Sequence, residues 1–378
     1  MMAEFQPPVR EDLRGLVPYG APQLDVDVRL NVNENPFAPS PELARALGAS
    51  VTEAAQTLNR YPDRECLELR QALADYLSRE SSAEYGVESI WVANGSNEVM
   101  SHIMAAFGGP GRVALSFPPT YSMYPEYARE SFTTLVSVPR TPDFQIDMAA
   151  STAAIEDQRP SVVLLASPNN PTGTAVSADD IAALAQATAD VGGMLVVDEA
   201  YAEFRRPGQP SSVAGLADHP NVIVTRTMSK AFAMAGARVG YAAAAPSVID
   251  ALRVVRLPYH LSAVTQSVAC TALAFVEELQ SNLQLLRDER DRMRRDMESR
   301  GFVVADSDAN FCFFGRFRDR RRVWEGLVDR GVLIRETGPD QWLRVSVGTP
   351  QENARFIEVL DEVVVDSDLT SDGDGGST

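Results

Sequence analysis

The hydrophobic and polar positions alternate between two kinds of segment over the first two thirds of the chain. Short apolar runs rich in β-branched residues indicate seven buried strands, at residues 89–93, 112–117, 133–139, 161–167, 194–199, 221–227 and 238–245. Helical periodicity lies between most of them, as at residues 179–191, where Ile181, Leu184 and Thr188 share one face. Strands that alternate with helices form a mostly parallel sheet with helices on both faces. We therefore predict an α/β fold built on a seven-stranded sheet.

After Leu261 the pattern changes, and it predicts a smaller α+β domain. A helix-like stretch covers residues 263–299, followed by strands at 302–305 and 311–317, a helix at 320–330, strands at 332–335 and 342–347, and a helix at 351–364. A chain of 378 residues also fits two domains. We expect an N-terminal arm (1–34), a large domain (35–262), a small domain (263–365) and a disordered acidic tail (366–378).

Polar motifs follow three of the predicted parallel strands, and one of them contains Lys230. Because the carboxyl ends of parallel strands lie at one edge of the sheet, these motifs can form a single site. Lys230 is the only lysine among the 34 Lys and Arg residues. Arginine can replace lysine in most roles, but it cannot lose a proton near neutral pH and attack a carbonyl. The surviving lysine is therefore a candidate nucleophile.

Composition narrows the classes of partner. The net charge of −18 argues against nucleic acid and anionic membranes, and an anionic ligand would need a local cluster of arginines. Cys66, Cys270 and Cys312 are odd in number and far apart, which argues against disulfides and a zinc site, and we predict no metal. Neither an apolar run long enough for a membrane span nor a signal segment is seen, so we expect a cytoplasmic enzyme.

Several motifs together resemble a known superfamily. Asn170-Pro171-Thr172-Gly173, Asp198-Glu199-Ala200-Tyr201 and Ser229-Lys230, with Arg238 downstream, resemble the aspartate-aminotransferase superfamily, the fold-type-I enzymes that use pyridoxal 5'-phosphate (PLP). Further motifs are similar to those of histidinol-phosphate aminotransferases, particularly the actinobacterial ones: residues 33–36, 60–63, 94–98, 118–124, 257–262, 307–311 and 342–349. The resemblance covers residues from about 30 to about 360.

The resemblance implies a role for each candidate residue around PLP. Lys230 would bind the cofactor covalently and then move protons. Asp198 would pair with the ring nitrogen, Asn170 and Tyr201 would donate to the ring oxygen, and Tyr121 would stack on the ring. The cofactor's phosphate would be held by the side chains of Thr227, Ser229 and Arg238 and by the backbone amides of Ser96 and Asn97, at the start of a predicted helix.

The resemblance also implies the substrates. Arg335 and Arg344 would bind the phosphate of L-histidinol phosphate and then the carboxylate of glutamate, with Asn170 beside them. Tyr61 would reach the site of the other subunit in a homodimer, and Tyr19 would be a contact from the N-terminal arm. The reaction expected is transamination between L-histidinol phosphate and 2-oxoglutarate, which gives imidazole-acetol phosphate and L-glutamate in histidine biosynthesis. An aromatic-amino-acid aminotransferase and a threonine-phosphate decarboxylase of the same superfamily remain alternatives.

Overall fold

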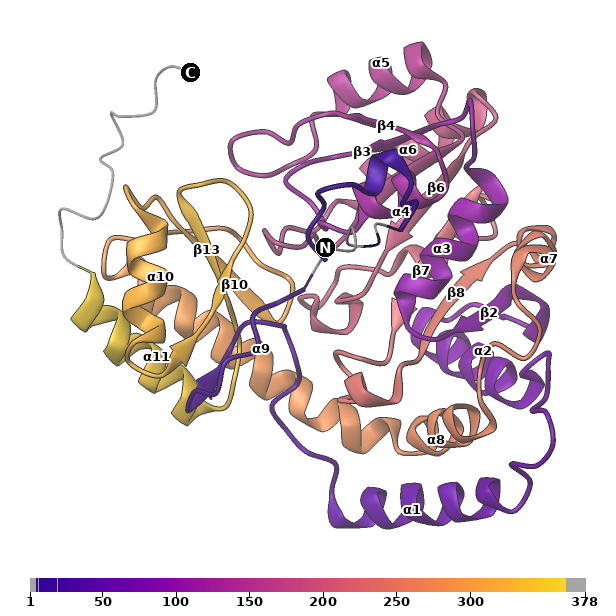
Figure 1. Cartoon of the computed structure of the whole chain (residues 1–378), viewed down its shortest axis with the longest axis horizontal. Helices are drawn as coiled ribbons and strands as arrows, with labels where there is room; N and C mark the ends of the chain where they lie inside the picture. The colour runs from indigo at the N-terminus through magenta and orange to yellow at the C-terminus, as the bar shows by residue number, and fades with distance from the viewer. Residues whose placement is uncertain (1–4, 6, 19, 365–378) are drawn as a thin grey trace.

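The computed structural model describes residues 5, 7–18 and 20–364, and it contains two layered parts (Figure 1). The larger part surrounds a seven-stranded sheet and the smaller part surrounds a four-stranded sheet. Tyr19 and the predicted tail at 366–378 lie outside the described residues. No helix among the described residues is both long enough and apolar enough to span a membrane.

The large sheet contains each of the seven predicted strands. Its order is β2-β8-β7-β6-β5-β3-β4. All neighbours are parallel except β8, which is antiparallel to both β2 and β7, because a loop with one short 3-10 turn, and no crossover helix, joins β7 to β8. The bounds are β2 Ile90–Ala93, β3 Val113–Ser116, β4 Thr134–Ser137, β5 Val162–Ala166, β6 Met194–Asp198, β7 Val222–Thr227 and β8 Gly240–Ala244.

Both faces of this sheet are buried under helices, as the continuous apolar runs predict. Neighbouring residues of one strand enter different hydrophobic clusters: Val163 and Leu165 pack on one face, whereas Val162 and Leu164 pack on the other. The covering helices are α2 Leu67–Ser81, α3 Ser96–Phe107, α4 Tyr124–Glu130, α5 Met148–Gln158, α6 Ala178–Asp190 and α7 Pro246–Val255, while α1 Pro41–Ala55 lies further out against α8 Ala263–Ala274.

The smaller part is an antiparallel sheet of order β12-β13-β10-β9 covered by helices. Its strands are β9 Val303–Val304, β10 Phe311–Gly315, β12 Arg335–Glu336 and β13 Trp342–Ser346, and its helices are α9 Val276–Glu298, α10 Arg320–Val328 and α11 Pro350–Val363. The last helix begins with a capping box, in which Thr349 and Glu352 satisfy each other's backbone amides. The predicted division of the chain at residue 262 stays a prediction.

Two predicted elements were wrong as single segments. The helix expected at 263–299 is broken at Phe275, whose backbone leaves the helical region, so that α8 packs on α1 and α2 while α9 packs on β10 and α11. The strand expected at 332–335 is also divided. Its first half, β11 Val332–Leu333, pairs in parallel with the N-terminal strand β1 Val28–Arg29, and its second half is β12.

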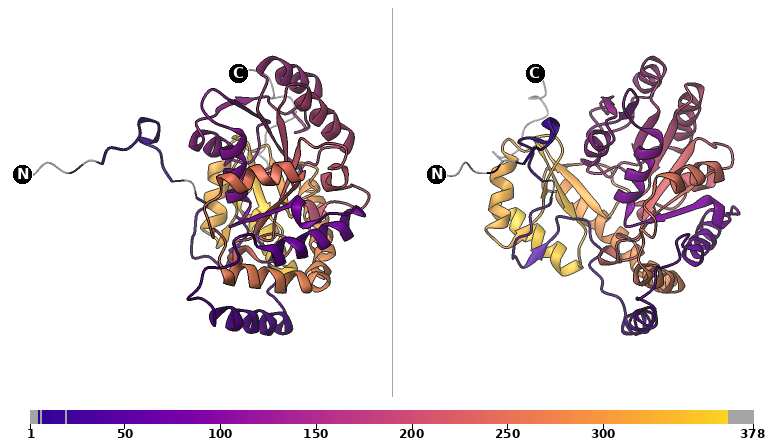
Figure 2. Two further views of the ribbon diagram at one scale, coloured as in Figure 1. Left: turned by 90° about the vertical axis from the view of Figure 1, so that its right-hand side faces the viewer. Right: turned by 45° about the vertical axis from the view of Figure 1, so that its right-hand side comes forward.

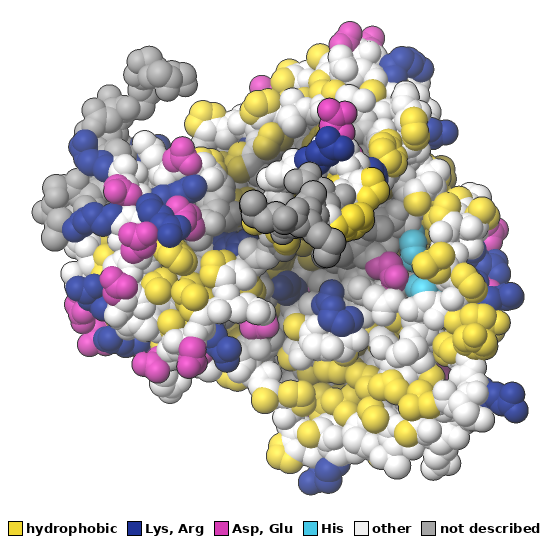
Figure 3. Space-filling model, in the orientation of Figure 1, with side chains coloured by type: hydrophobic (Ala, Val, Ile, Leu, Met, Phe, Trp, Pro, Cys, Tyr) yellow, Lys and Arg dark blue, Asp and Glu magenta, His cyan; other side chains and the backbone are white. Residues whose placement is uncertain are grey.

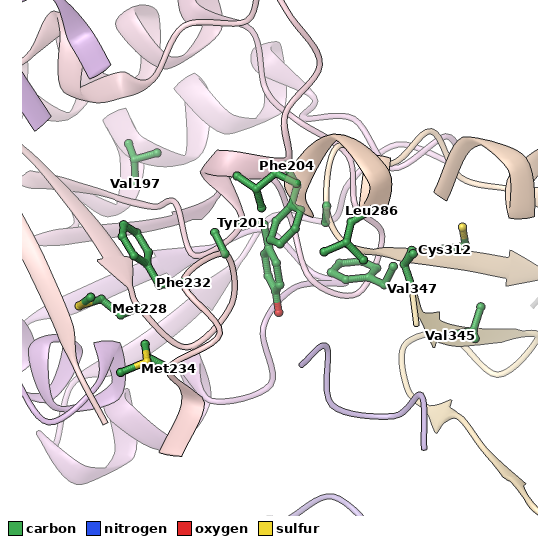
Figure 4. Packing of buried hydrophobic residues seen from close by; sticks show 14 of the residues in the cluster. Val197, Tyr201, Phe204, Met228, Phe232, Met234, Leu286, Cys312, Val345 and Val347 are labelled. Carbon is green, nitrogen blue, oxygen red and sulfur yellow. The ribbon is translucent and has the colours of Figure 1, made fainter. Parts of the chain in front are cut away.

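The N-terminal segment and the two parts of the chain meet around Tyr201. In Figure 2 the first described residues extend away from the body before the chain reaches β1. Figure 4 shows Tyr201 and Phe204 between Met228 and Phe232 of the large part and Leu286 and Val347 of the small part. One hydrophobic core is therefore continuous across both parts, which holds their facing edges together.

Candidate active site

A cavity of about 470 Å³ lies where the carboxyl ends of β5, β6 and β7 face the small sheet. This volume is within the range of small-molecule sites. Figure 3 looks onto the hollow between the two parts, with basic side chains beside it. Four cationic side chains line it, from Lys230, Arg238, Arg335 and Arg344, against two acidic ones, from Glu34 and Asp198. The cavity is therefore locally positive in a chain whose net charge is −18.

Lys230 enters the cavity from the loop after β7. Its Nζ donates to the backbone oxygen of Val32 at 2.9 Å. Burial, and after it the positive charge of Arg344, lower the pKa of Lys230 from 10.5 to about 8. The negative charge of Glu34 raises this pKa, and the positive charge of Arg238 lowers it. An amine with such a pKa is available as a nucleophile near neutral pH.

Asp198 ends β6 and is nearly enclosed, with 7% of its surface exposed. Tyr124 donates to its Oδ2 at 3.1 Å, and Thr225 donates to its Oδ1 at 3.4 Å. Burial raises its pKa to about 6, although the bonds from Tyr124, Ala200 and Thr225 oppose this shift. A cation placed beside this carboxylate would keep it ionised, so the position is suited to a positively charged ring nitrogen.

Asn170 contacts both Tyr201, the other candidate ring-oxygen donor, and Arg344 of the small sheet. Its Nδ2 donates to the hydroxyl of Tyr201 at 3.4 Å, while its Oδ1 accepts from Nη1 of Arg344. Asn33 also donates to the Tyr201 hydroxyl, at 3.0 Å. Residues from the N-terminal segment, the large sheet and the small sheet thus form one hydrogen-bonded group.

An anion cradle lies where β7, β8 and α3 meet. Thr227 donates to the hydroxyl of Ser229 at 3.0 Å, and Arg238 donates to the same hydroxyl at 3.3 Å. Ser96 and Asn97 begin α3, where backbone amides have no acceptor within the helix. Gly95 precedes them with φ +82°, and a Cβ at this position would lie 2.4 Å from Nη2 of Arg238. Glycine is thus required for the guanidinium to approach the helix start.

The two predicted substrate arginines lie opposite each other on neighbouring strands. Arg335 of β12 pairs with Arg344 of β13, so both side chains leave the same face of the sheet. Arg344 is only 6% exposed, its Nη2 donates to the Asn31 oxygen at 2.8 Å, and its guanidinium lies over the ring of Phe311. Tyr121 also lines the cavity and donates to Asn97 at 3.3 Å.

One predicted residue is not brought to the cavity of its own chain. Tyr61 is 79% exposed and stacks on Tyr259 with ring centroids 4.4 Å apart. Sequence reasoning had also left out Tyr124 and Asn33, which contact Asp198 and Tyr201. Both lie within motifs that the resemblance included, but their contacts join segments far apart in the chain, and no local spacing shows such contacts.

Comparisons with known proteins agree on the family. Residues 26–360 match the family model for class I and II aminotransferases. A histidinol-phosphate aminotransferase of Thermobifida fusca is 59% identical over 93% of this chain and 94% of its own length. The histidinol-phosphate aminotransferase of Frankia casuarinae is 52% identical over 97% of this chain and 92% of its own length.

A solved structure has the same fold. The histidinol-phosphate aminotransferase of Sinorhizobium meliloti, in complex with pyridoxal-5'-phosphate, aligns with a TM-score of 0.79 at 27% identity and covers 90% of this chain and 92% of that one. The chain therefore belongs to the class I and II aminotransferase family, and these relatives within it are histidinol-phosphate aminotransferases.

Proposed function

We propose that this protein is a PLP-dependent aminotransferase that exchanges an amino group between L-histidinol phosphate and 2-oxoglutarate, giving imidazole-acetol phosphate and L-glutamate in histidine biosynthesis. The observation that carries the proposal is the convergence of Lys230, Asp198, the Asn170–Tyr201 pair and two facing arginines on one cavity. Relatives of this identity over nearly the whole chain support the choice of substrates.

The residues present fit PLP. The cradle of Thr227, Ser229 and Arg238 beside the start of α3 offers hydroxyl, guanidinium and amide donors to a phosphate, and Gly95 leaves the room that a Cβ would fill. Asp198 offers a buried anion for the ring nitrogen. When bound, PLP supplies an electron sink for the carbon that carries the substrate's amino group. The other chemistry belongs to the chain's own side chains.

Lys230 would hold the cofactor and afterwards move the proton. In the lowered pKa range its Nζ is partly neutral near pH 7, so it can accept a proton from the substrate carbon and return it elsewhere. The bond from Nζ to the Val32 oxygen shows that this amine reaches the N-terminal wall of the cavity. Asn170 and Tyr201 would orient the ring oxygen, and Tyr121 would cover the ring.

Arg344 and Arg335 would clamp the anionic end of each substrate in turn. Two guanidinium groups on one face of neighbouring strands can make paired bonds to either a phosphate or a carboxylate. Arg344 is held in place by Asn170, Asn31 and Phe311, so little side-chain freedom would be lost on binding.

We further propose a homodimer in which Tyr61 completes the site of the other subunit. Large apolar side chains close in sequence to the stacked Tyr61 and Tyr259 are exposed: Leu58, Leu67, Val254 and Leu257. Figure 3 shows further hydrophobic side chains in the region of α1 and α8. Exposed apolar patches of this kind mark association surfaces. Tyr19 stays a predicted substrate contact and the cytoplasmic location stays a prediction.

The test uses purified protein loaded with PLP. L-histidinol phosphate, an aromatic amino acid and threonine phosphate are each supplied with 2-oxoglutarate, and formation of glutamate and release of carbon dioxide are measured. The proposal expects the highest kcat/KM for L-histidinol phosphate and no carbon dioxide. Preference for the aromatic donor, or decarboxylation of threonine phosphate, would refute it and favour one of the two alternatives.

A further inference from the structure

A cluster of buried charges lies behind the candidate site, on the opposite side of β6 and β7. Arg226 is 1% exposed, and its Nε and Nη2 donate to Oε2 of Glu199 at 3.0 and 2.9 Å. Its Nη2 also donates to Glu80 at 3.1 Å and to Ser211 at 2.7 Å. We call Arg226, Glu199, Glu80, Glu203 and Arg205 the Arg226 cluster.

The cluster and the candidate site alternate residue by residue along the strands. Thr225 and Thr227 of β7 face the side of Asp198, whereas Arg226, between them, faces the other side. Glu199 follows Asp198 directly and points the same way as Arg226. The backbone amide of Glu199 also donates to the Thr225 oxygen at 2.8 Å. The Glu199–Arg226 pair therefore ties together the two strand ends that carry Asp198 and the turn leading to Lys230.

Burial of this pair is costly for stability. Removing two ions from water costs several kcal/mol each, and apolar residues of the same volume often serve a core at least as well. The pair does not line the cavity described above. What it offers, and an apolar contact would not, is directional bonding from a rigid guanidinium fork to one carboxylate.

We propose that Glu199 and Arg226 are positioning residues for the reaction, which hold Asp198 and the turn at 227–230 in register without touching substrate or cofactor. This inference rests on the proposed function. A small displacement of a reacting group can reduce a rate by about a hundredfold. Loss of the pair should therefore affect turnover more than substrate binding.

The remaining charged groups around the pair provide a matched control. Glu80 approaches Arg226 from α2 and is partly exposed, Glu203 and Arg205 approach from the segment after β6, and Tyr241 approaches from β8. Burial raises the pKa of Glu203 to about 7, despite the opposing charge of Arg226. Glu80 is a carboxylate bonded to the same guanidinium, but it is attached to a helix and not to a strand end.

The experiment compares Glu199→Gln with Glu80→Gln in the PLP-loaded enzyme. Both variants remove one carboxylate charge from Arg226 and keep the side-chain volume. We expect Glu199→Gln to lower kcat by about tenfold to a hundredfold, with KM changed by less than about threefold and with full cofactor content. Glu80→Gln should keep kcat within about threefold of the original enzyme, while both variants lower the midpoint of thermal unfolding.

A spectroscopic readout separates positioning from general stability. Burial and the charge of Glu199 both raise the pKa of Asp198, although bonds from Tyr124, Ala200 and Thr225 lower it. The negative charge of Glu199 favours the protonated form of Asp198 and, in the same way, of the cofactor beside it. Removing this charge should therefore shift the pH midpoint of the bound cofactor's visible absorbance downward. Glu80→Gln should shift it less, because the Glu80 side chain is partly exposed and its charge is screened by solvent.

The inference is overturned if Glu199→Gln and Glu80→Gln change kcat equally and shift the pH midpoint of the cofactor's absorbance equally. If Glu199→Gln does not fold, Glu199→Asp takes its place, because it keeps the charge but withdraws the carboxylate from Arg226. Equal kcat in Glu199→Asp and Glu80→Gln would then overturn it. The original enzyme is assayed first with L-histidinol phosphate. If that reaction fails, the proposed function fails, and the same comparison is made with whichever amino donor the enzyme accepts.

Discussion

The pKa of Lys230 is a property of the candidate site that can be predicted in magnitude and in sign. It falls from 10.5 to about 8, first because the amine is buried and second because Arg344 is close. At 1.36 kcal/mol per pKa unit, this shift corresponds to about 3 kcal/mol in favour of the neutral amine. At pH 7 about one lysine in ten would be neutral, against roughly one in three thousand for an ordinary lysine.

The same shift predicts how Lys230 affects the stability of the cofactor-free protein. The folded pKa is lower than the unfolded one, so the unfolded chain binds more protons between pH 8 and 10.5. The contribution of the neutral amine to the stability of the folded protein is complete above pH 10.5 and is lost as the pH falls towards 8. Replacement of Arg344 by Met should raise the pKa of Lys230, because it removes a neighbouring positive charge.

Competitive acetylation measures this pKa directly. Cofactor-free protein is labelled with acetic anhydride between pH 6 and 11, and the peptide that contains Lys230 is quantified by mass spectrometry. Because Lys230 is the only lysine, no other ε-amine in the chain is labelled, and peptide mapping separates Lys230 from the N-terminal α-amine. Arg335→Met is the matched control, since Arg335 lines the same cavity but is not among the charges that shift Lys230. A midpoint near 10.5, or one that Arg344→Met leaves unchanged, would refute the reasoning.

Three further substitutions test the proposed roles. Lys230→Arg should keep the fold but lose covalent attachment of PLP, because arginine is not a nucleophile; borohydride reduction and peptide mapping should label Lys230 in the original protein and nothing in the variant. Asp198→Asn should retain cofactor but raise the activation free energy of turnover by several kcal/mol, which lowers kcat. Near-normal turnover would show that Asp198 does not serve the ring nitrogen. Arg344→Lys should weaken the interaction with the phosphate of L-histidinol phosphate and with the carboxylate of glutamate by about 1.5–3 kcal/mol each, because a point charge replaces the planar fork. Single-turnover kinetics with each substrate measures this loss, and a normal reaction with glutamate alone would show that the two anions bind separately.

The central sheet could be predicted from the chain almost completely. Seven predicted runs became seven strands. Six of them are largely buried on both faces and therefore have a nearly continuous hydrophobic sequence, whereas the edge strand β4 is partly exposed and begins and ends with polar residues. The small part was less predictable. The break at Phe275 lies inside a stretch with helical periodicity, and the division of residues 332–335 between β11 and β12 depends on pairing with β1, some 300 residues earlier in the chain.

The candidate site shows the same division. Lys230, Asp198 and Asn170 could be found from the sequence because each lies at the end of a recognisable strand or just after it, and the carboxyl ends of parallel strands lie at one edge. Asn33 and Tyr124, by contrast, contact Tyr201 and Asp198 across 168 and 74 positions. No periodicity reports a contact of that separation.

By itself the sequence determined the mostly parallel sheet, the one lysine and the resemblance to aminotransferases, since these depend on local hydrophobic patterning and on residue chemistry that cannot be exchanged. Only the tertiary structure decided that the pKa of Lys230 is lowered, that the Tyr124 hydroxyl donates to Asp198 and that the Arg226–Glu199 ion pair lies behind the site. Burial and charge act through space, so their effects on a group depend on neighbours that folding brings together from distant parts of the chain.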